Sequence, residues 1–296
     1  MSHNFVNLQG ELRFNEPLSK HTSWRVGGIA QQFYRAKDVA DLALFLSQLP
    51  QDEPLLWLGL GSNLLVRDGG FAGTVISTVG TLQNLEIAGT TINAEVGVYC
   101  GKLAKKSARS GLTGAAFLAG IPGTLGGALA MNAGAHNSDT WALVVEVTTI
   151  DRQGQLHIRQ PEEFNVGYRH VELPQGEWFA SAKLNLAVGN ADDEAEQIKQ
   201  LLKRRNISQP TNQPCAGSVF RNPEGDFSGR LIELCELKGL AIGGASVSQK
   251  HANFIVNDGT ATAADIEALI LLVQQKVQQA TGVELMPEVH IIGEAA

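Results

Sequence analysis

Short apolar stretches alternate with polar turns along nearly the whole 296-residue chain. Apolar residues that recur every three or four positions predict helices, and short apolar runs bounded by turn residues predict strands. On this basis, helices are expected at residues 39–49, 102–110, 192–205, 228–237 and 263–277. Strands are expected at residues 55–58, 64–66, 74–76, 144–150, 156–158, 178–186 and 285–292. This mixture, in which we find no internal repeat, predicts an α+β fold.

Local signals indicate where several of these elements begin and end. Asp38 can cap the first helix, and Thr262 with Asp265 has the spacing of a capping box. Gly111 stands just after the second helix, where a left-handed residue commonly ends a helix. The turn at residues 151–154 lies between two predicted strands, so we expect a β-hairpin there.

The character of the sequence changes near residue 190. A helix opens there on acidic residues and closes on the basic run Lys203–Arg205, an order that complements the helix dipole. The polar, proline-containing segment Gln209–Pro214 follows it. We therefore expect a domain boundary near this helix, with residues 1–190 in a long N-terminal domain and residues 191–296 in a smaller C-terminal one.

Composition narrows the class of protein. With 44% hydrophobic residues the chain can bury a sizeable core, and a net charge of −7 without a concentrated basic face argues against nucleic-acid binding. The three cysteines form no CxxC pair, so neither a zinc site nor a disulfide framework is expected. No secretory signal is visible, and the uncharged stretch 110–138 is too rich in glycine for a membrane-spanning helix. We expect a cytoplasmic protein.

Glycine is unusually frequent, at 32 of 296 residues, and two glycine-rich segments stand out. Gly59–Asn63 directly follows a predicted strand and could bring backbone amides close to a phosphate, or simply form a tight turn. It lacks the third glycine of the Rossmann fingerprint. Gly120–Gly134 lacks the lysine of an ATP-binding P-loop. Two such loops suit a long anionic ligand such as a dinucleotide, although close structural packing would use the same glycines.

Motifs along nearly the whole chain resemble, in the same order, those of the UDP-N-acetylenolpyruvoylglucosamine reductase family. They are His21–Gly28, Gly59–Asn63, Gly69–Gly73, Gly120–Gly134, Gly167–Arg169, Gly217–Pro223, Lys250–Phe254 and Pro287–Val289. The short run 168–178 resembles the family's second, shorter form. The sequence departs from the motifs in two places. Residues Ala135–Ser138 replace an aromatic–glycine continuation, which puts the local loop shape in doubt. Arg221 replaces a lysine that is common in the family, and it keeps the positive charge.

The resemblance implies a reductase of peptidoglycan synthesis that uses noncovalent FAD and NADPH. Its substrate would be the enolpyruvyl ether of UDP-N-acetylglucosamine, reduced to UDP-N-acetylmuramate. The implied fold is an FAD-binding domain of the vanillyl-alcohol oxidase type, with subdomains at roughly 1–76 and 77–190, followed by an α+β substrate domain at 191–296. The last strand could return to the first subdomain. The expected partners are small molecules, with neither nucleic acid nor membrane.

The chemistry requires a fixed cation for the substrate carboxylate, a polar partner for the charge that develops there, and a proton donor. The resemblance assigns these parts to Arg169, Glu288 and Ser218 respectively. Each residue also has an ordinary interpretation: a surface arginine in a loop, an edge-strand glutamate facing solvent, and a turn serine. The family motifs favour the catalytic interpretation for all three.

The glycine loops and the motifs also indicate binding residues. Those expected to contact FAD are Gly59, Gly61, Ser62, Asn63, Gly120, Gly123, Thr124, Gly126, Gly127 and Asn132. Those expected to contact the substrate are Tyr168, Asn222 and Asn253, although such residues are as often structural hydrogen bonders. Cys100 could suggest a covalent flavin, but a buried apolar cysteine is the interpretation we favour.

Two other functions would use part of the same sequence. An oxidase or dehydrogenase on the same FAD scaffold would keep the glycine loops, but would have no reason to carry both Gly217–Pro223 and Glu288. A flavin-binding module without catalysis would need neither. NADPH consumption measured with and without the UDP-sugar distinguishes the three.

Overall fold

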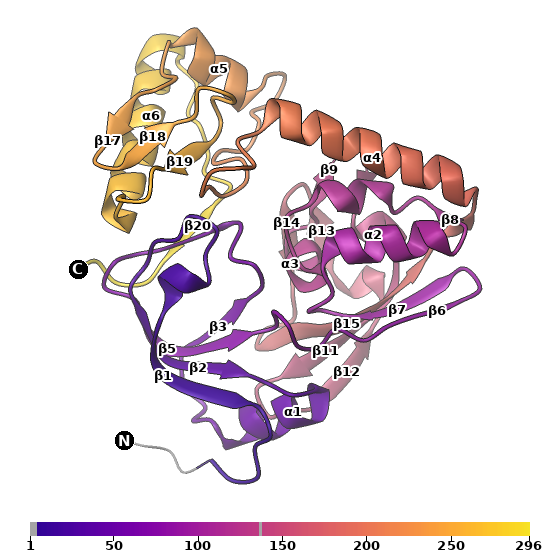
Figure 1. Ribbon diagram of the computed structural model, residues 1–296. Helices are drawn as coiled ribbons and strands as arrows, with labels where there is room; N and C mark the ends of the chain where they lie inside the picture. Colours follow the sequence, from indigo (N-terminus) through magenta and orange to yellow (C-terminus); the bar gives the residue numbers. More distant parts are fainter. Residues whose placement is uncertain (1–4, 136–137) are drawn as a thin grey trace. The chain divides into compact units, whose positions relative to one another are not determined.

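A computed structural model describes residues 5–135 and 138–296 of the chain (Figure 1). The chain folds into two compact units, and each is assembled from three separate stretches of sequence. The first unit comprises Met1–Arg13, Gln32–Gly59 and Gly73–Lys203. The second unit comprises Phe14–Gln31, Leu60–Ala72 and Arg204–Ala296. Among the described residues, no helix combines the length and apolar character needed to cross a membrane.

An antiparallel sheet with the strand order β12-β11-β15-β7-β6 forms much of the first unit. Its strands are β6 (Leu85–Ala88), β7 (Thr91–Glu95), β11 (Val144–Asp151), β12 (Leu156–Arg159) and β15 (Glu177–Asn185). Helix α3 (Leu125–Ala130) packs against β7 and β15, and α2 (Cys100–Arg109) lies beside it (Figure 1). One apolar core runs through these elements, with Ile92 and Leu103 fully buried in it.

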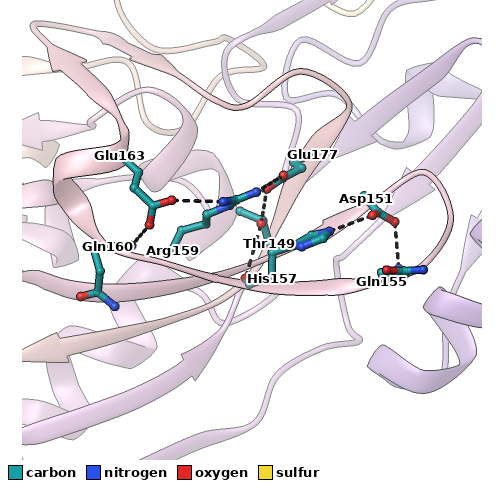
Figure 2. Close-up of polar contacts among 8 residues, drawn as sticks. All are labelled: Thr149, Asp151, Gln155, His157, Arg159, Gln160, Glu163 and Glu177. Atoms are coloured by element: carbon teal, nitrogen blue, oxygen red, sulfur yellow. Dashed lines mark hydrogen bonds and ion pairs between the residues drawn. The ribbon is translucent and has the colours of Figure 1, made fainter.

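A network of polar side chains joins three strands of this sheet (Figure 2). The Arg159 guanidinium donates to Glu177 at 2.5 Å and to Glu163 at 3.1 Å, and the Thr149 hydroxyl donates to the second oxygen of Glu177 at 2.5 Å. The hydrogen bond from Arg159 keeps the pKa of Glu177 below its usual value. His157 also contacts the carboxylate of Asp151, at 2.7 Å. None of these residues is a predicted site residue, so the network is a structural feature of the sheet.

A second sheet has the strand order β1-β2-β5-β3. Its strands are β1 (Glu11–Pro17), β2 (Ile29–Arg35), β3 (Leu55–Leu58) and β5 (Phe71–Ser77). Strands β3 and β5 run parallel, with Leu58 opposite Ser77. Helix α1 (Val39–Gln48) begins at Asp38, whose carboxylate accepts the amide of Asp41 at 2.9 Å. Since β3 ends at Leu58, Gly59 lies at the carboxyl end of a parallel strand, a common place for a ligand.

The second unit contains a small antiparallel sheet, β17-β18-β19, and two helices. The elements are β17 (Ala241–Ile242), β18 (Ala245–Val247), β19 (Ile255–Asn257), α5 (Ser228–Leu234) and α6 (Ala263–Thr281). Helix α6 packs against α5, β17 and β18 (Figure 1). It begins with the expected capping box, in which Thr262 and Asp265 exchange hydrogen bonds of 3.1 and 2.9 Å. Strand β4 (Leu64–Val66) pairs in parallel with β20 (His290–Ile292).

The remaining elements are short, apart from α4 (Ala191–Ser208). The short strands are β8 (Leu112–Thr113), β9 (Gly134–Ala135), β10 (Ser138–Asp139), β13 (Asn165–Gly167), β14 (His170–Glu172) and β16 (Ala187–Val188). The 3-10 helices are Leu18–Lys20, Ala116–Gly120, Trp141–Leu143 and Pro161–Glu163. Strands β13 and β14 form a hairpin whose two turn residues are Tyr168 and Arg169.

The predicted α+β fold is confirmed, and the strands at 55–58 and 64–66 have the predicted bounds. Two predicted extents were wrong. The helix expected to reach Leu237 ends at Leu234, because Glu236 adopts a left-handed conformation (φ +57°) and the Leu237 amide bonds to the carbonyl of Ile232. The last strand begins at His290 rather than at 285. The motif departure at 135–138 falls partly on residues 136–137, outside the described residues.

Candidate functional site

The first glycine-rich segment, Gly59–Asn63, leads from β3 into β4. The carbonyls of Gly61 and Ser62 accept hydrogen bonds from the amides of Ser23 (3.2 Å) and Gly217 (3.0 Å). Gly61 has φ +59°, and a Cβ there would lie 2.4 Å from a neighbouring carbonyl oxygen. Among the residues that the structure describes, the amides of Gly61 and Ser62 donate to no backbone oxygen. The loop therefore uses its carbonyls for folding and leaves amides available to an anionic ligand.

The second glycine-rich segment contains a buried hydroxyl with an unusual environment. Thr124 is the N-cap residue of α3, but its side chain makes no capping hydrogen bond. Its Oγ1 is buried and has no hydrogen-bond partner in the described part of the chain. A Cβ on Gly59 would lie 2.7 Å from this oxygen, so the two glycine-rich segments meet here. Because an unpaired buried hydroxyl costs about 1–3 kcal/mol, this one points to a bond made with a ligand.

The glycines of the second segment fall into two groups. A Cβ on Gly126 would lie 2.9 Å from Cβ of Val96, so this glycine allows close packing. A Cβ on Gly120 or Gly127 would have no described atom within 4 Å, and one on Gly123 would have only a methyl group, at 3.6 Å. Close packing therefore accounts for Gly126, whereas the space around Gly120, Gly123 and Gly127 leaves room for a ligand.

Arg169 is held in the turn between β13 and β14. It has a left-handed backbone (φ +55°), which is uncommon for a residue other than glycine and typical of functional sites. Its Nη2 donates to the carbonyl of Gly134 at 2.9 Å, and its Cζ lies 5.1 Å from the centre of the Tyr168 ring. Asn132 anchors the same turn, because its Nδ2 donates to the carbonyl of Gly167 at 3.3 Å. The guanidinium is therefore fixed by backbone groups before any ligand is considered.

Ser218 lies between two anchored neighbours in the second unit. The amide of Gly217 donates to the carbonyl of Ser62, and the amide of Val219 donates to the carbonyl of Asn253, both at 3.0 Å. Within the described residues, the Ser218 hydroxyl has no hydrogen-bond partner. Its backbone is thus fixed on both sides, while its hydroxyl remains available to a substrate.

Glu288 is attached directly to the segment that contains Ser218. The amide of Glu288 donates to the carbonyl of Val219 at 2.7 Å, and the carbonyl of Glu288 accepts from Nδ2 of Asn63 at 3.0 Å. The sequence predicted that Glu288 lies in a strand, which is wrong: Pro287 has no amide hydrogen, and the segment around it forms only an isolated bridge with Phe220. The bonds nevertheless bring Asn63, Ser218 and Glu288 together in one unit.

The three predicted substrate contacts differ in their surroundings. Asn253 is buried, and its carboxamide bonds to both the amide (2.9 Å) and the carbonyl (2.8 Å) of Phe220. Asn222 is exposed, and its Oδ1 accepts the amide of Ser228, the first residue of α5, at 3.2 Å. Tyr168 is exposed in its hairpin turn. Asn253 is therefore already occupied by the protein, whereas the Tyr168 ring is free to contact a ligand.

His251 is a neighbour of this site that the sequence did not single out. Its Nδ1 accepts the amide of Asn253 at 3.2 Å. Burial lowers the pKa of His251, and the positive charge of Lys238 lowers it further, so the ring is neutral near pH 7. The motif Lys250–Phe254 contains this histidine, but its spacing gives no signal of which ring nitrogen is used or where the ring packs.

Cys100 is almost fully buried at the start of α2, and its burial raises the pKa of the thiol to about 12. A protonated thiol is a poor nucleophile. The environment of Cys100 therefore suits a packing role rather than attachment of a cofactor.

The predicted site residues are divided between the two units. Those in the first unit are Gly59, Gly120, Gly123, Thr124, Gly126, Gly127, Asn132, Tyr168 and Arg169. Those in the second are Gly61, Ser62, Asn63, Ser218, Asn222, Asn253 and Glu288. Across the described ranges, no group of three or more His, Cys, Asp or Glu side chains could hold a metal ion.

Comparison with known proteins relates this arrangement to one family. Residues 209–292 match the C-terminal domain of UDP-N-acetylenolpyruvoylglucosamine reductase, and residues 30–158 match an FAD binding domain. The reductase of Legionella pneumophila (strain Corby) is 58% identical over 296 residues, which cover 99% of this chain and 96% of that protein. The reductase of Nitrosococcus oceani is 56% identical over 292 residues and 98% of each chain. The crystal structure of the reductase from Thermus caldophilus aligns with a TM-score of 0.81 at 32% identity, covering 96% of this chain and 99% of that one.

Proposed function

The chain belongs to the UDP-N-acetylenolpyruvoylglucosamine reductase family, and from this membership we propose how its residues carry out the reaction. The protein is an FAD-containing oxidoreductase of peptidoglycan synthesis, and it reduces the enolpyruvyl ether of UDP-N-acetylglucosamine to UDP-N-acetylmuramate. We propose NADPH as the source of hydride and the cytoplasm as the place of reaction.

The residues around the two glycine-rich segments fit FAD. The Thr124 hydroxyl lacks a partner among the described residues, and it would donate a hydrogen bond to a phosphate oxygen of the cofactor. In the same unit as Thr124, the glycines Gly120, Gly123 and Gly127 leave room for the cofactor to approach the backbone. When bound, FAD supplies the redox chemistry that passes hydride from NADPH to the substrate.

Arg169 is proposed to hold the carboxylate of the enolpyruvyl group. Its guanidinium is permanently charged and offers paired N–H donors, which suit a carboxylate better than the single point charge of lysine. The bond from Nη2 to Gly134 and the anchoring of the turn by Asn132 fix its direction. As hydride reaches the terminal carbon, negative charge moves onto the carboxylate, and a cation fixed in advance stabilises that charge without reorganising.

Ser218 is proposed to donate the proton that completes the reduction. After hydride addition, the carbon next to the carboxylate becomes basic enough to take a proton from a hydroxyl. The Ser218 hydroxyl is available and its backbone is fixed on both sides. Glu288 is proposed to stabilise the negative charge on the substrate carboxylate by donating a hydrogen bond from its protonated carboxyl group. Its backbone amide is tied to the carbonyl of Val219, next to Ser218.

The observation that carries this assignment is the hydroxyl of Ser218, which has no partner among the described residues and whose chain neighbour Val219 accepts the amide of Glu288. Ser218→Ala tests it by separating turnover into two halves. Flavin reduction by NADPH should proceed at a near-normal rate, because it needs no proton donor for a carbon centre. Reoxidation by the UDP-sugar should slow by about 10²–10⁴-fold, the usual range for loss of general acid catalysis.

Stopped-flow absorbance of the flavin measures both halves in one preparation. Equal slowing of the two halves would show that Ser218 shapes the site generally, and undiminished reoxidation would remove it as proton donor. Rapid NADPH consumption by the unaltered protein in the absence of UDP-sugar would instead indicate an oxidase or dehydrogenase that uses another acceptor.

A further inference from the structure

On one side, the segment that carries Ser218 lies against the residues around Pro287. On that side, the amide of Arg221 donates to the carbonyl of Met286 at 2.9 Å, and the carbonyl of Val219 accepts the amide of Glu288 at 2.7 Å. These bonds set the segment against the residues around Glu288. These bonds do not include the amide or the carbonyl of Phe220. Because Phe220 is buried, both groups need hydrogen-bond partners elsewhere.

A side chain supplies both partners. Oδ1 of Asn253 accepts the amide of Phe220 at 2.9 Å, and Nδ2 of Asn253 donates to the carbonyl of Phe220 at 2.8 Å. The backbone carbonyl of Asn253 also accepts the amide of Val219 at 3.0 Å. The Asn253 carboxamide thus bonds to Phe220 as the peptide group of a neighbouring strand would, and Asn253 fixes the two residues that follow Ser218.

We propose that Asn253 is a positioning residue for Ser218, and not a residue whose side chain contacts the substrate. The proposal rests on the proposed role of Ser218 as proton donor. Both hydrogen-bonding groups of the carboxamide are engaged with Phe220, and the side chain is 3% exposed, so little of it is left for a sugar nucleotide. Only a primary amide offers a donor and an acceptor side by side, as a peptide group does.

Asn253→Asp tests the proposal because it keeps the shape of the side chain and replaces the donor by an ionisable oxygen. An ionised aspartate would direct an oxygen at the carbonyl of Phe220 and push the Ser218 segment away. Burial raises the pKa of an aspartate, and the protonated form recovers a donor. The activity of the variant relative to the unaltered protein should therefore rise as the pH is lowered. His251, whose ring accepts the Asn253 amide, titrates in both proteins, and a negative charge at residue 253 would raise its pKa. The pH dependence of the ratio therefore reports these two groups together.

The same chain offers a matched control. Asn257 is also 3% exposed, and its Nδ2 donates to the carbonyl of Trp24 at 2.8 Å while its Oδ1 accepts the amide of Gly259 at 2.7 Å. Asn257→Asp therefore buries the same charge against the same kind of partner, without touching the Ser218 segment. A general structural effect would appear in both variants, whereas a positioning effect would appear in one.

The expected result for Asn253→Asp at pH 8 is a kcat lowered about 10- to 100-fold, the loss typical of a catalytic group displaced by about 1 Å. The KM for the UDP-sugar and the rate of flavin reduction by NADPH should stay near normal. Asn257→Asp should keep its kcat after allowance for its folded fraction. A raised KM with normal kcat would instead make Asn253 a substrate contact, and equal losses in both variants would make its role purely structural; either result overturns the proposal.

Hydrogen exchange on the unaltered full chain gives a test that needs no variant. The amide of Phe220 should exchange as slowly as that of Glu288, and rapid exchange would overturn the proposal even if no variant could be purified. Failure of the proposed function can be told apart from failure of this proposal about Asn253. If the proposed function were wrong, the unaltered protein would show no reoxidation of its flavin by the UDP-sugar.

Discussion

Thr124→Val should stabilise the cofactor-free protein against unfolding and, at the same time, weaken its affinity for FAD. The Thr124 hydroxyl is buried, makes no capping bond to α3 and has no partner among the described residues. Valine has nearly the same shape and no hydroxyl. Because a buried polar group without a hydrogen bond costs about 1–3 kcal/mol, the substitution should raise the free energy of unfolding of the cofactor-free protein by about that amount.

The effect on the cofactor follows from the same hydroxyl. A hydrogen bond to a charged phosphate is worth about 1.5–3 kcal/mol, so its loss should raise the Kd for FAD about ten- to hundredfold. Thr149→Val is the matched control, since Thr149 is a buried threonine of the same unit whose hydroxyl is already bonded to Glu177 at 2.5 Å (Figure 2). That variant should lower the free energy of unfolding and leave the Kd for FAD unchanged.

Both quantities can be measured on apoprotein prepared by mild acid, which should release the flavin because it is held noncovalently. Denaturant unfolding gives the stability, and calorimetric titration with FAD gives the Kd. Two results would refute the reasoning: a cofactor-free Thr124→Val protein that is less stable than the unaltered one, or an FAD affinity that the substitution does not change. Flavin that stays with the acid-precipitated protein would refute noncovalent binding itself.

Three further predictions follow from single residues. Gly127→Ala and Gly101→Ala should each raise the free energy of unfolding of the apoprotein by about 0.5–1 kcal/mol, because both glycines are helical and a Cβ on either has no described atom within 4 Å. Only Gly127→Ala should weaken FAD binding in a titration. Arg169→Lys should lower kcat/KM for the UDP-sugar about ten- to hundredfold, because a point charge cannot hold a carboxylate at two points. The rate of flavin reduction by NADPH should stay near normal. A near-normal kcat/KM would exclude Arg169 as the carboxylate ligand. His251 has a pKa below 6.5 in the folded protein, so the unfolded chain binds its proton first as the pH falls and stability is lost below about pH 6.5. His251→Gln should make the free energy of unfolding fall less steeply between pH 6.5 and 5, and an unchanged slope would contradict this.

The sequence by itself determined those parts of the structure that depend on near neighbours. Asp38 and the pair Thr262–Asp265 begin their helices as predicted, since a cap requires only a side chain and an amide two or three residues away. Gly111 is left-handed at the end of α2 for the same local reason. The α+β fold and the hairpin at 151–154 likewise follow from periodicity and turn residues, both of which act over a few positions.

Tertiary structure decided which glycines matter. The sequence gives Gly126 and Gly127 the same expected role, contact with FAD, because a glycine residue gives no sign of what surrounds it. In the structure, a Cβ on Gly126 would lie 2.9 Å from Cβ of Val96, whereas one on Gly127 would have no described atom within 4 Å. Steric crowding depends on segments that arrive from elsewhere in the chain, so no local pattern contains it.

Tertiary structure also decided how the candidate catalytic residues are held. The sequence located Ser218 and Glu288 by their motifs, but not the carbonyl of Val219 that connects them or the carboxamide of Asn253 that bonds to Phe220. The helix expected to end at Leu237 ends three residues earlier, where Glu236, rather than a glycine, takes the left-handed position. The helix end depends on a local bond, from the Leu237 amide to the Ile232 carbonyl, but it is made at a residue type that seldom adopts the left-handed region. The bonds of Val219 and Asn253 form only when distant segments meet, and a backbone donor or acceptor is the same at every position of the sequence.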